Sequence, residues 1–177
     1  EQGLYGKAEP LYTEAINVIT QFLEEHPNNL EAIELLGDAY GHQKKWGEAS
    51  VEFKKLIQAD DNDANYHYKY AGVLGMKALE NKFKSIGYIG DIKSSFERAA
   101  ELDPNHVEAR WALVELYMQL PGIFGGGKNK SLCFAEELEN LSKVDGYLAK
   151  VYIYEYDDEP ELAEKYYRLA IKVGGSV

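Results

Sequence analysis

The sequence predicts an all-α fold in which antiparallel helix pairs stack into a solenoid. Three observations support this: apolar residues recur at three- and four-residue spacing, helix-ending segments follow at regular intervals, and matched residues return 34 positions later. Sustained strand-like alternation is absent from the sequence. At 177 residues the chain can bury a continuous core, so we expect a single array over 1–177.

Amphipathic spacing defines the helices. In 30–43, Ile33, Leu36 and Tyr40 share one helical face because they lie three and four residues apart, and acidic residues form a second face. The same spacing predicts eight helices, the last of which is interrupted near Asp157–Pro160. They cover 9–25, 30–43, 46–59, 64–80, 91–102, 106–119, 129–143 and 147–172.

The intervening segments carry residues that end one helix and start the next. Asp and Asn side chains cap free amides, and Pro cannot continue a preceding helix. Pro10 and Pro160 stand where a first helical turn would begin, a position where the missing N–H costs little. The predicted breaks are His26–Asn29, Asp60–Asp63, Asp103–His106 and Val144–Gly146.

An internal repeat relates these helices to one another. Ala15, Ile19 and Phe22 precede Ala49, Phe53 and Leu56 by 34 residues, and a third set at Ile92, Phe96 and Ala99 follows after a nine-residue insertion. A helix pair cannot bury its apolar face alone, so neighbouring pairs stack. We expect small residues to allow close helix approach and large ones to fill the space between pairs. The small residues are Gly37, Ala49 and Ala163, and the large ones are Phe53, Phe96 and Tyr167.

On this period and these residues, the chain resembles tetratricopeptide repeat (TPR) proteins over nearly its whole length. Leu30–Asp63 is the best match, although Ile33 stands where the family often has Trp. Pro121–Gly126 reads Pro-Gly-Ile-Phe-Gly-Gly and resembles a loop found in a bacterial subgroup that also carries a long insertion between paired helices. The resemblance implies a right-handed superhelix of antiparallel helix pairs and informs the fold more than the function.

The resemblance also divides the chain into units. Repeat 64–106 contains the insertion 81–90, and its Phe83, Ile86, Tyr88 and Ile89 should fold back onto the repeats. The units are a partial repeat 9–29, repeats 30–63, 64–106 and 107–146 (with a Gly-rich loop at 121–128), and an irregular unit 147–173.

A partner-binding groove follows from the family's geometry, in which the first helix of each pair lines the concave surface through its positions 2, 5, 9 and 12. Those positions are acidic here and include two large aromatic side chains, which suits a basic or amphipathic peptide. The alternative is a polar face that is merely solvated. The predicted groove residues are Glu31, Glu34, Asp38, Tyr68, Glu108, Trp111 and Glu115.

One family variant is disfavoured. TPR domains that clamp a C-terminal carboxylate use Lys and Asn at positions 5 and 9 of the first clamp repeat. This chain has Glu34 and Asp38 there, and both would repel a carboxylate.

Charge and composition exclude several classes. With 19 Lys and Arg against 30 Asp and Glu, the net charge of −11 argues against nucleic-acid binding. No apolar run reaches the roughly 18–20 residues of a membrane span. We expect no metal and no cofactor. The compartment stays open: the cytoplasm or, if a signal peptide was removed before Glu1, the periplasm or export.

Other chemistry-bearing residues have structural explanations. Gly122–Lys128 has the spacing of a phosphate loop, but Asn129 replaces the final Ser or Thr and the loop follows a helix rather than a strand. An anion at the next helix start remains an alternative. Cys133 is expected to be a small buried apolar residue, and His26 and His106 to be surface turn residues.

The sequence therefore predicts a protein-interaction scaffold without catalysis. One alternative is a self-assembly module that uses the tyrosine-rich ends, Tyr5 and Tyr12 with Tyr166 and Tyr167. A second is anion or nucleotide binding at Gly122–Lys128. The oligomeric state and the partner stay open.

Overall fold

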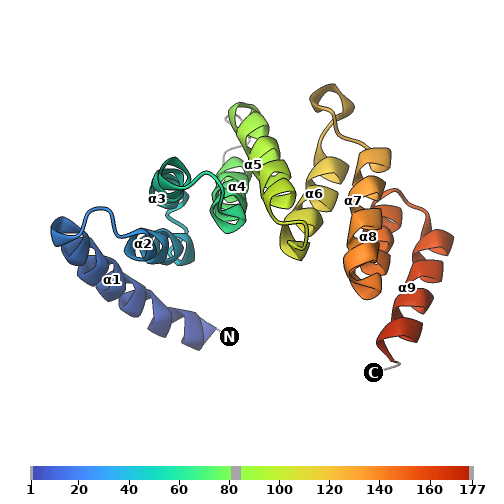
Figure 1. The fold of residues 1–177 in the computed structure, drawn as a ribbon. Helices are drawn as coiled ribbons and strands as arrows, with labels where there is room; N and C mark the ends of the chain where they lie inside the picture. The colour runs from blue at the N-terminus through green and yellow to red at the C-terminus, as the bar shows by residue number, and fades with distance from the viewer. Residues whose placement is uncertain (1, 81–84, 176–177) are drawn as a thin grey trace. The chain divides into compact units, whose positions relative to one another are not determined.

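The protein is all-α in its computed structural model, which describes residues 2–80 and 85–175, with side chains from residue 9 onward (Figure 1). Nine α-helices and two short 3-10 helices lie within these residues, which confirms the predicted fold class. They are α1 (Gln2–Glu25), α2 (Leu30–His42), α3 (Trp46–Ala59), α4 (Ala64–Glu80), η1 (Ser85–Tyr88), α5 (Ile89–Leu102), α6 (Val107–Gln119), η2 (Gly122–Phe124), α7 (Lys128–Leu141), α8 (Lys143–Tyr156) and α9 (Pro160–Gly174).

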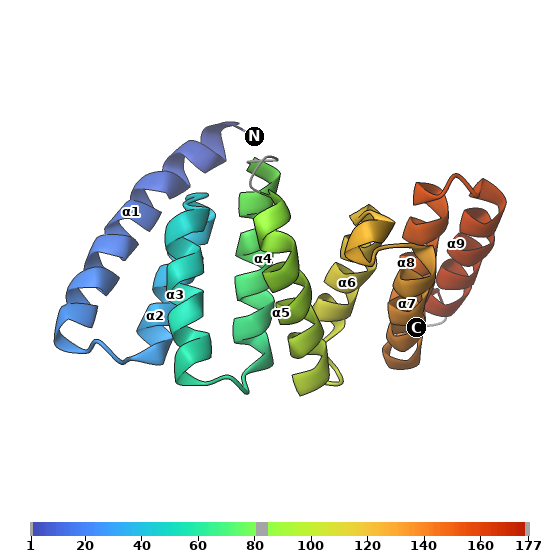
Figure 2. The same cartoon turned by 90° about the horizontal axis from the view of Figure 1, so that it is seen from above.

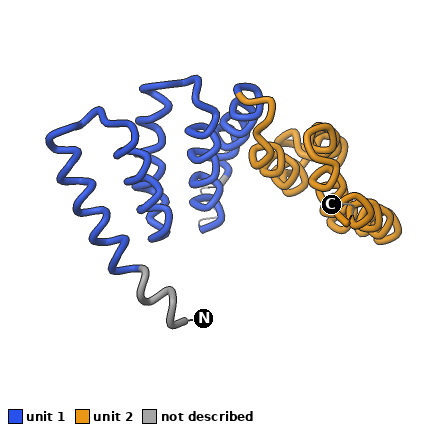
Figure 3. The backbone as a smooth tube through the Cα atoms, turned by 60° about the horizontal axis from the view of Figure 1, so that its bottom comes forward, with its two compact units in different colours: residues 1–102 blue, residues 103–177 orange. Residues whose placement is uncertain are grey.

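Consecutive helices pack in two compact units, residues 1–102 and residues 103–177 (Figure 3). In the first unit α1 lies on α2, α2 pairs with α3, α3 lies on α4, and α4 pairs with α5 (Figure 2). In the second unit α6 pairs with α7, α7 lies on α8, and α8 pairs with α9. The pairing follows the predicted repeat arithmetic.

The core of the first unit relies on one small-to-large contact. Phe53 of α3 is buried with Ala49, Leu56 and Val73, and its ring lies directly against Gly37 of α2. A Cβ atom built on Gly37 would stand 2.9 Å from two carbons of that ring. The absence of a side chain at Gly37 is what lets α2 and α3 approach this closely.

The second unit has a core of the same kind. Val114, Leu138 and Ile153 are fully buried together. The Ser131 hydroxyl donates a 2.8 Å hydrogen bond to the carbonyl oxygen of Val114, so this polar group is satisfied inside the core. Tyr117 stacks on Phe134 with ring centroids 5.6 Å apart.

Three side-chain contacts between helices span 34 residues. The indole Nε1 of Trp46 donates to Glu80, and that of Trp111 donates to Asp145, each across 34 residues. Gln43 donates to the carbonyl oxygen of Glu9 over the same separation. Of these contacts, that of Trp111 with Asp145 joins the first helices of two neighbouring pairs.

Two helix boundaries differ from the prediction. Helix α1 begins at Gln2 and contains Pro10, so that proline does not start the helix. Val144–Gly146 lies inside α8 and is no break, because Ser142 alone separates α7 from α8 and its hydroxyl oxygen accepts the N–H of Asp145. Gly146 then lies against the backbone of Glu139, where no side chain would fit. The predicted interruption near Asp157–Pro160 is confirmed as the turn between α8 and α9.

The inserted segment is only partly folded back as predicted. Tyr88 and Ile89 are half-buried, and the Lys77 ammonium lies 5.2 Å from the Tyr88 ring centroid. Ile86 is exposed, contrary to expectation, because η1 packs through Tyr88. Phe83 lies outside the described residues.

Three single-residue predictions are wrong. Cys133 is exposed, because Ser131, Ala135 and Leu138 form the buried face of α7. His106 is mostly buried, since it caps α6 by accepting the Ala109 N–H at Nδ1. Tyr167 is largely exposed, because no further helix of the described residues covers that side of α9.

Candidate functional site

The predicted groove residues of the first unit lie on the first helices of two neighbouring pairs, α2 and α4. Asn29 caps α2 through its side-chain oxygen, which accepts the Ala32 N–H at 2.8 Å. This start sets the helical phase that places Glu31, Glu34 and Asp38 along one side of α2. Glu31 is exposed, and the other two are half-buried.

A lysine lies between the two inner carboxylates. Lys69 of α4 donates to Glu34 Oε1 at 2.7 Å and to Asp38 Oδ2 at 2.6 Å. Asn65, one turn earlier, donates to the same Glu34 oxygen at 3.1 Å. Asn65 takes position 2 of its helix, one of the predicted groove positions. Lys69 was not predicted, although it lies 35 and 31 residues from Glu34 and Asp38, close to one repeat.

The charged form of Lys69 is stabilised by this arrangement. Burial disfavours the ammonium, but the hydrogen bonds to Asp38 and Glu34 outweigh it, so the pKa of Lys69 is raised above its usual value. The side chain also passes the Phe53 ring, with Nζ 5.7 Å from the centroid. One positive and two negative charges therefore meet here, and this part of the predicted acidic stripe is partly neutralised.

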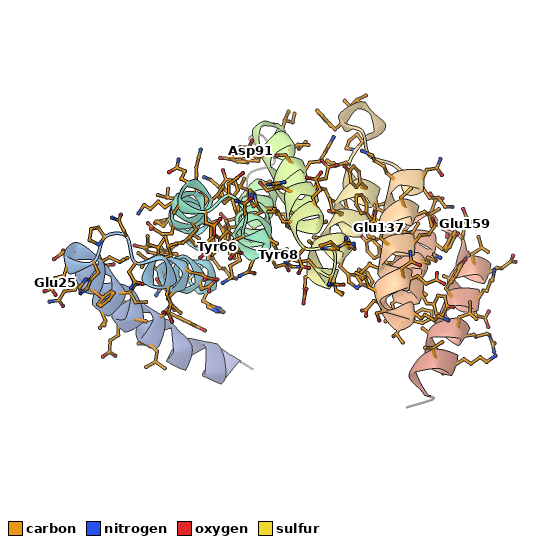
Figure 4. All side chains as sticks on the ribbon, viewed as in Figure 1. Glu25, Tyr66, Tyr68, Asp91, Glu137 and Glu159 are labelled. Carbon is orange, nitrogen blue, oxygen red and sulfur yellow. The ribbon has the colours of Figure 1, made fainter. Side chains whose placement is uncertain are left out.

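Tyr68 is set apart from that cluster. Its ring lies 5.9 Å from the buried Phe96 of α5, tilted by 50°. The side chain is half-buried, so it lies against the core of its own helix pair while presenting an edge to solvent (Figure 4).

The predicted residues of the second unit lie on α6, whose neighbouring first helix is α8. The Trp111 indole is half-buried against the core, and its Nε1 donates to Asp145 of α8 at 3.3 Å. Further along the same two helices, Gln119 donates to the Tyr152 hydroxyl at 3.4 Å, and the Tyr152 ring lies 6.1 Å from the exposed Tyr156. A fixed tryptophan and two tyrosines thus share this face.

The acids of the second unit differ in their surroundings. Glu115 is exposed on α6, and the described residues form no ion pair with it. Glu108 Oε2 lies 3.2 Å from His106 Nδ1, the nitrogen that also accepts the Ala109 N–H. A nitrogen that accepts the Ala109 N–H has no proton with which to donate to Glu108. We therefore assign the hydrogen bond to Ala109 and treat Glu108 as a negative charge at the surface.

The Gly-rich loop uses its polar groups internally. Gly125 and Gly127 have positive φ, and their N–H groups donate to the carbonyl oxygens of Gly122 and Tyr117. Lys128 is bound by Asp157 at 2.7 Å and by Glu159, and these hydrogen bonds raise the pKa of Lys128. Three glycine amides of the loop and the Lys128 cation therefore already have protein partners, which argues against an anion site.

Two further features bear on function. Within the described residues, His, Cys, Asp and Glu do not gather in threes as they would around a metal ion. Their helices also include none with the length and apolar character needed to cross a membrane.

Comparison with known proteins gives the class of protein. Residues 2–72 match the tetratricopeptide repeat family. Among solved structures, MamA is similar at 20% identity, with 96% of this chain and 92% of that chain covered and a TM-score of 0.73. TTC0263 from Thermus thermophilus is similar at 16% identity, with 96% and 87% covered and a TM-score of 0.69. YrrB, described as "a TPR protein with an unusual peptide-binding site", is similar at 18% identity, with 94% of this chain and 80% of that chain covered and a TM-score of 0.66.

Residues 2–72 therefore resemble tetratricopeptide repeats in sequence, and the chain has a TPR-like fold. No curated protein matches its sequence. At these identities the solved structures show the fold alone. Tetratricopeptide repeats generally serve as non-catalytic scaffolds for protein interactions, so the match over residues 2–72 suggests protein partners.

Proposed function

We propose that the chain is a non-catalytic scaffold that binds a peptide or protein partner in an acidic, aromatic groove along the first helices of its repeats. The groove residues are those predicted from the sequence, with Lys69 and Asn65 added. A basic or amphipathic partner fits this surface best, because acids outnumber lysines on it. The YrrB description, which names a peptide-binding site on a TPR protein, is consistent with this.

The observation that carries the proposal is the fixed tryptophan of α6. Binding hot spots are rigid aromatic side chains whose ordering costs little on association. Asp145 holds the Trp111 indole through Nε1, and the core supports one side of the ring. The adjacent Tyr152 and Tyr156 extend the apolar surface along α8.

The predicted groove residues of the two units differ in charge. Lys69 neutralises part of the Glu34–Asp38 pair, so attraction of a positive ligand falls mainly on Glu108 and Glu115 in the second unit. In the first unit, the Lys69 cluster presents both signs and suits hydrogen bonding to a peptide backbone. The two surfaces would thus recognise different features of a partner.

The test is capture of partners from the source organism's lysate by three proteins: wild type, Glu115→Lys and Glu161→Lys. Glu115 and Glu161 are both exposed acids, but Glu161 lies on a second helix, α9. We expect Glu115→Lys to lose partners that Glu161→Lys retains, and the wild-type capture to weaken as salt rises. Equal capture by all three proteins would refute the groove.

Trp111 provides a second test with a partner found in this way. Trp111→Phe keeps apolar bulk but removes the hydrogen bond to Asp145, so we expect weaker binding with the helical content unchanged. Full retention of affinity would show that the indole is not the anchor. A dilution series by analytical ultracentrifugation separates this function from self-assembly, for which the apparent mass would fall on dilution.

A further inference from the structure

A second surface lies on α1. Leu11, Ala15, Val18 and Phe22 recur at spacings of four, three and four, so they form one stripe along the helix. Val18 is 62% exposed, Leu11 65% and Phe22 44%. We call these four residues the α1 stripe. A soluble helix normally has one apolar face, and α1 already uses another face, with Ile16 and Ile19, to pack on α2.

The internal repeat allows the α1 stripe to be compared with the equivalent residues of α3. Ala15, Val18 and Phe22 lie 34 residues before Ala49, Glu52 and Leu56 of α3. Those three α3 residues are 0%, 7% and 0% exposed, and α3 packs between α2 and α4. The α1 stripe therefore corresponds in the repeat to a surface that neighbouring helices bury in α3, whereas Leu11, Val18 and Phe22 are exposed.

The stripe continues into a shallow groove bounded by α2. Val18 and Phe22 line it together with Ala32 and Leu35, and Glu31 stands at its edge. Leu35 is itself half-exposed. The His26 ring lies 4.6 Å from the Phe22 ring at one end of the stripe.

The charges around the α1 stripe indicate which kind of partner fits it. Residues 8–43 contain seven acids and no Lys or Arg. Glu14 and Glu25 flank the stripe on α1 by helical spacing, and Glu31 bounds it on α2; Figure 4 marks Glu25 at this end of the helix. All three are exposed, and the described residues give them no ion pair. An apolar stripe edged by unpaired acids is complementary to an amphipathic helix edged by basic residues.

The repeat also places one of those basic residues. Asn65 of α4 reaches Glu34, the fifth residue of α2. Glu31 occupies in α2 the position that Asn65 occupies in α4, 34 residues later. A helix lying on α1 as α2 lies on α3 would bring its own fifth residue to Glu31, where a lysine or arginine forms an ion pair.

We propose that the α1 stripe and Leu35 dock an amphipathic helix of a partner protein, with basic residues beside its apolar face. A second copy of this chain is the poorer occupant, because its net charge of −11 repels the same acids. The proposal shares Glu31 with the groove on the first helices, and its apolar residues lie outside that groove.

The chain supplies its own probe. A fluorescent peptide of residues 30–43 carries the apolar pattern that covers α3, and a lactam staple on its outer face keeps it helical. The basic probe has Glu31→Lys, Glu34→Lys and Asp38→Lys, and the acidic probe has the natural residues. We expect the basic probe to bind the full chain with a Kd at least about tenfold lower at low salt, and the difference to shrink as salt rises.

Variants of the chain test the location. Val18→Ser and Phe22→Ser should each raise the Kd of the basic probe at least about fivefold, whereas Ile171→Ser, at a 71% exposed site on α9, should leave it unchanged. Glu31→Gln should weaken binding and flatten its salt dependence. Glu24→Gln, on the opposite side of α1 by helical spacing, is the matched control. Unchanged circular dichroism melts show that each variant is folded.

Several results would overturn the proposal. These are no binding of either probe, equal binding of both probes, or a Kd that Val18→Ser and Phe22→Ser do not change. Sedimentation of the chain alone tests whether a second copy occupies the stripe. A dimer that Val18→Ser dissociates would assign the stripe to a second copy and not to a basic partner.

Discussion

The contact between Gly37 and Phe53 supports a sharp stability prediction. Gly37→Ala adds one methyl group, and its carbon would lie 2.9 Å from Cε1 and Cζ of Phe53. Favourable carbon–carbon contacts lie at about 3.5–4.0 Å, so either the ring or helix α2 must move. The ring cannot move freely, because Ala49, Leu56 and Val73 enclose it.

The magnitude follows from two opposing effects. Overpacking of an enclosed core costs about 1–3 kcal/mol. Replacing a helical glycine by alanine returns about 1 kcal/mol of helix propensity. Gly72→Ala isolates the second effect, because Gly72 lies in α4 and a Cβ there meets nothing within 4 Å. The free energies of unfolding of the two variants should therefore differ by about 1–3 kcal/mol, with Gly72→Ala the more stable.

Urea denaturation followed by circular dichroism measures this difference, provided that the m-values agree. Gly37→Leu should destabilise further than Gly37→Ala. The double variant Gly37→Ala with Phe53→Leu removes the ring carbons that clash, so it should be more stable than the sum of its single changes predicts. Equal effects of Gly37→Ala and Gly72→Ala would show that α2 does not meet α3 at Gly37.

Three further predictions concern other contacts. Gly146→Ala places a methyl group on the backbone of Glu139, which cannot swing aside, so we expect a loss of about 3 kcal/mol or more in urea denaturation; a loss no larger than that of Gly75→Ala, at an open site, would contradict this packing. The raised pKa of Lys69 gives stability that is complete below the usual lysine pKa of 10.5 and is lost as pH rises through the folded pKa. The free energy of unfolding of Lys69→Met should therefore be lower than that of wild type at pH 8, and this difference should shrink at strongly alkaline pH. A difference that stays constant with pH would refute the charge pairing. Excess phosphate, ATP or GTP should leave the melting temperature unchanged, because the loop amides and Lys128 are already bonded, and a saturable rise would restore an anion site.

Much of the architecture could be predicted because it depends on local periodicity. The spacing of Ile33, Leu36 and Tyr40 fixes a helical face, and the 34-residue return of Ala15 at Ala49 fixes the order of stacking. The close approach at Gly37 also followed from the pattern of small and large residues. The boundary between α7 and α8 could not be predicted this way, because a single serine, Ser142, replaces the expected turn.

The candidate site was predicted in outline and corrected in its chemistry. Position within a repeat predicted Glu34 and Asp38 on one face of α2, and Trp111 on the corresponding face of α6. That Lys69 binds the two acids, and that Asp145 holds the indole, depends on how far each side chain reaches across the helix layer. A hydropathy pattern does not show which side chains contact each other across neighbouring helices.

The sequence by itself determined the helices, their pairing and the acidic character of the surface, since each depends on residues near one another or one repeat apart. Only the tertiary structure decided which charges are neutralised, that His106 caps a helix, that Cys133 faces solvent and that the α1 stripe is uncovered. These depend on which neighbour occupies the space beside a side chain, and that neighbour is set by packing across the repeats.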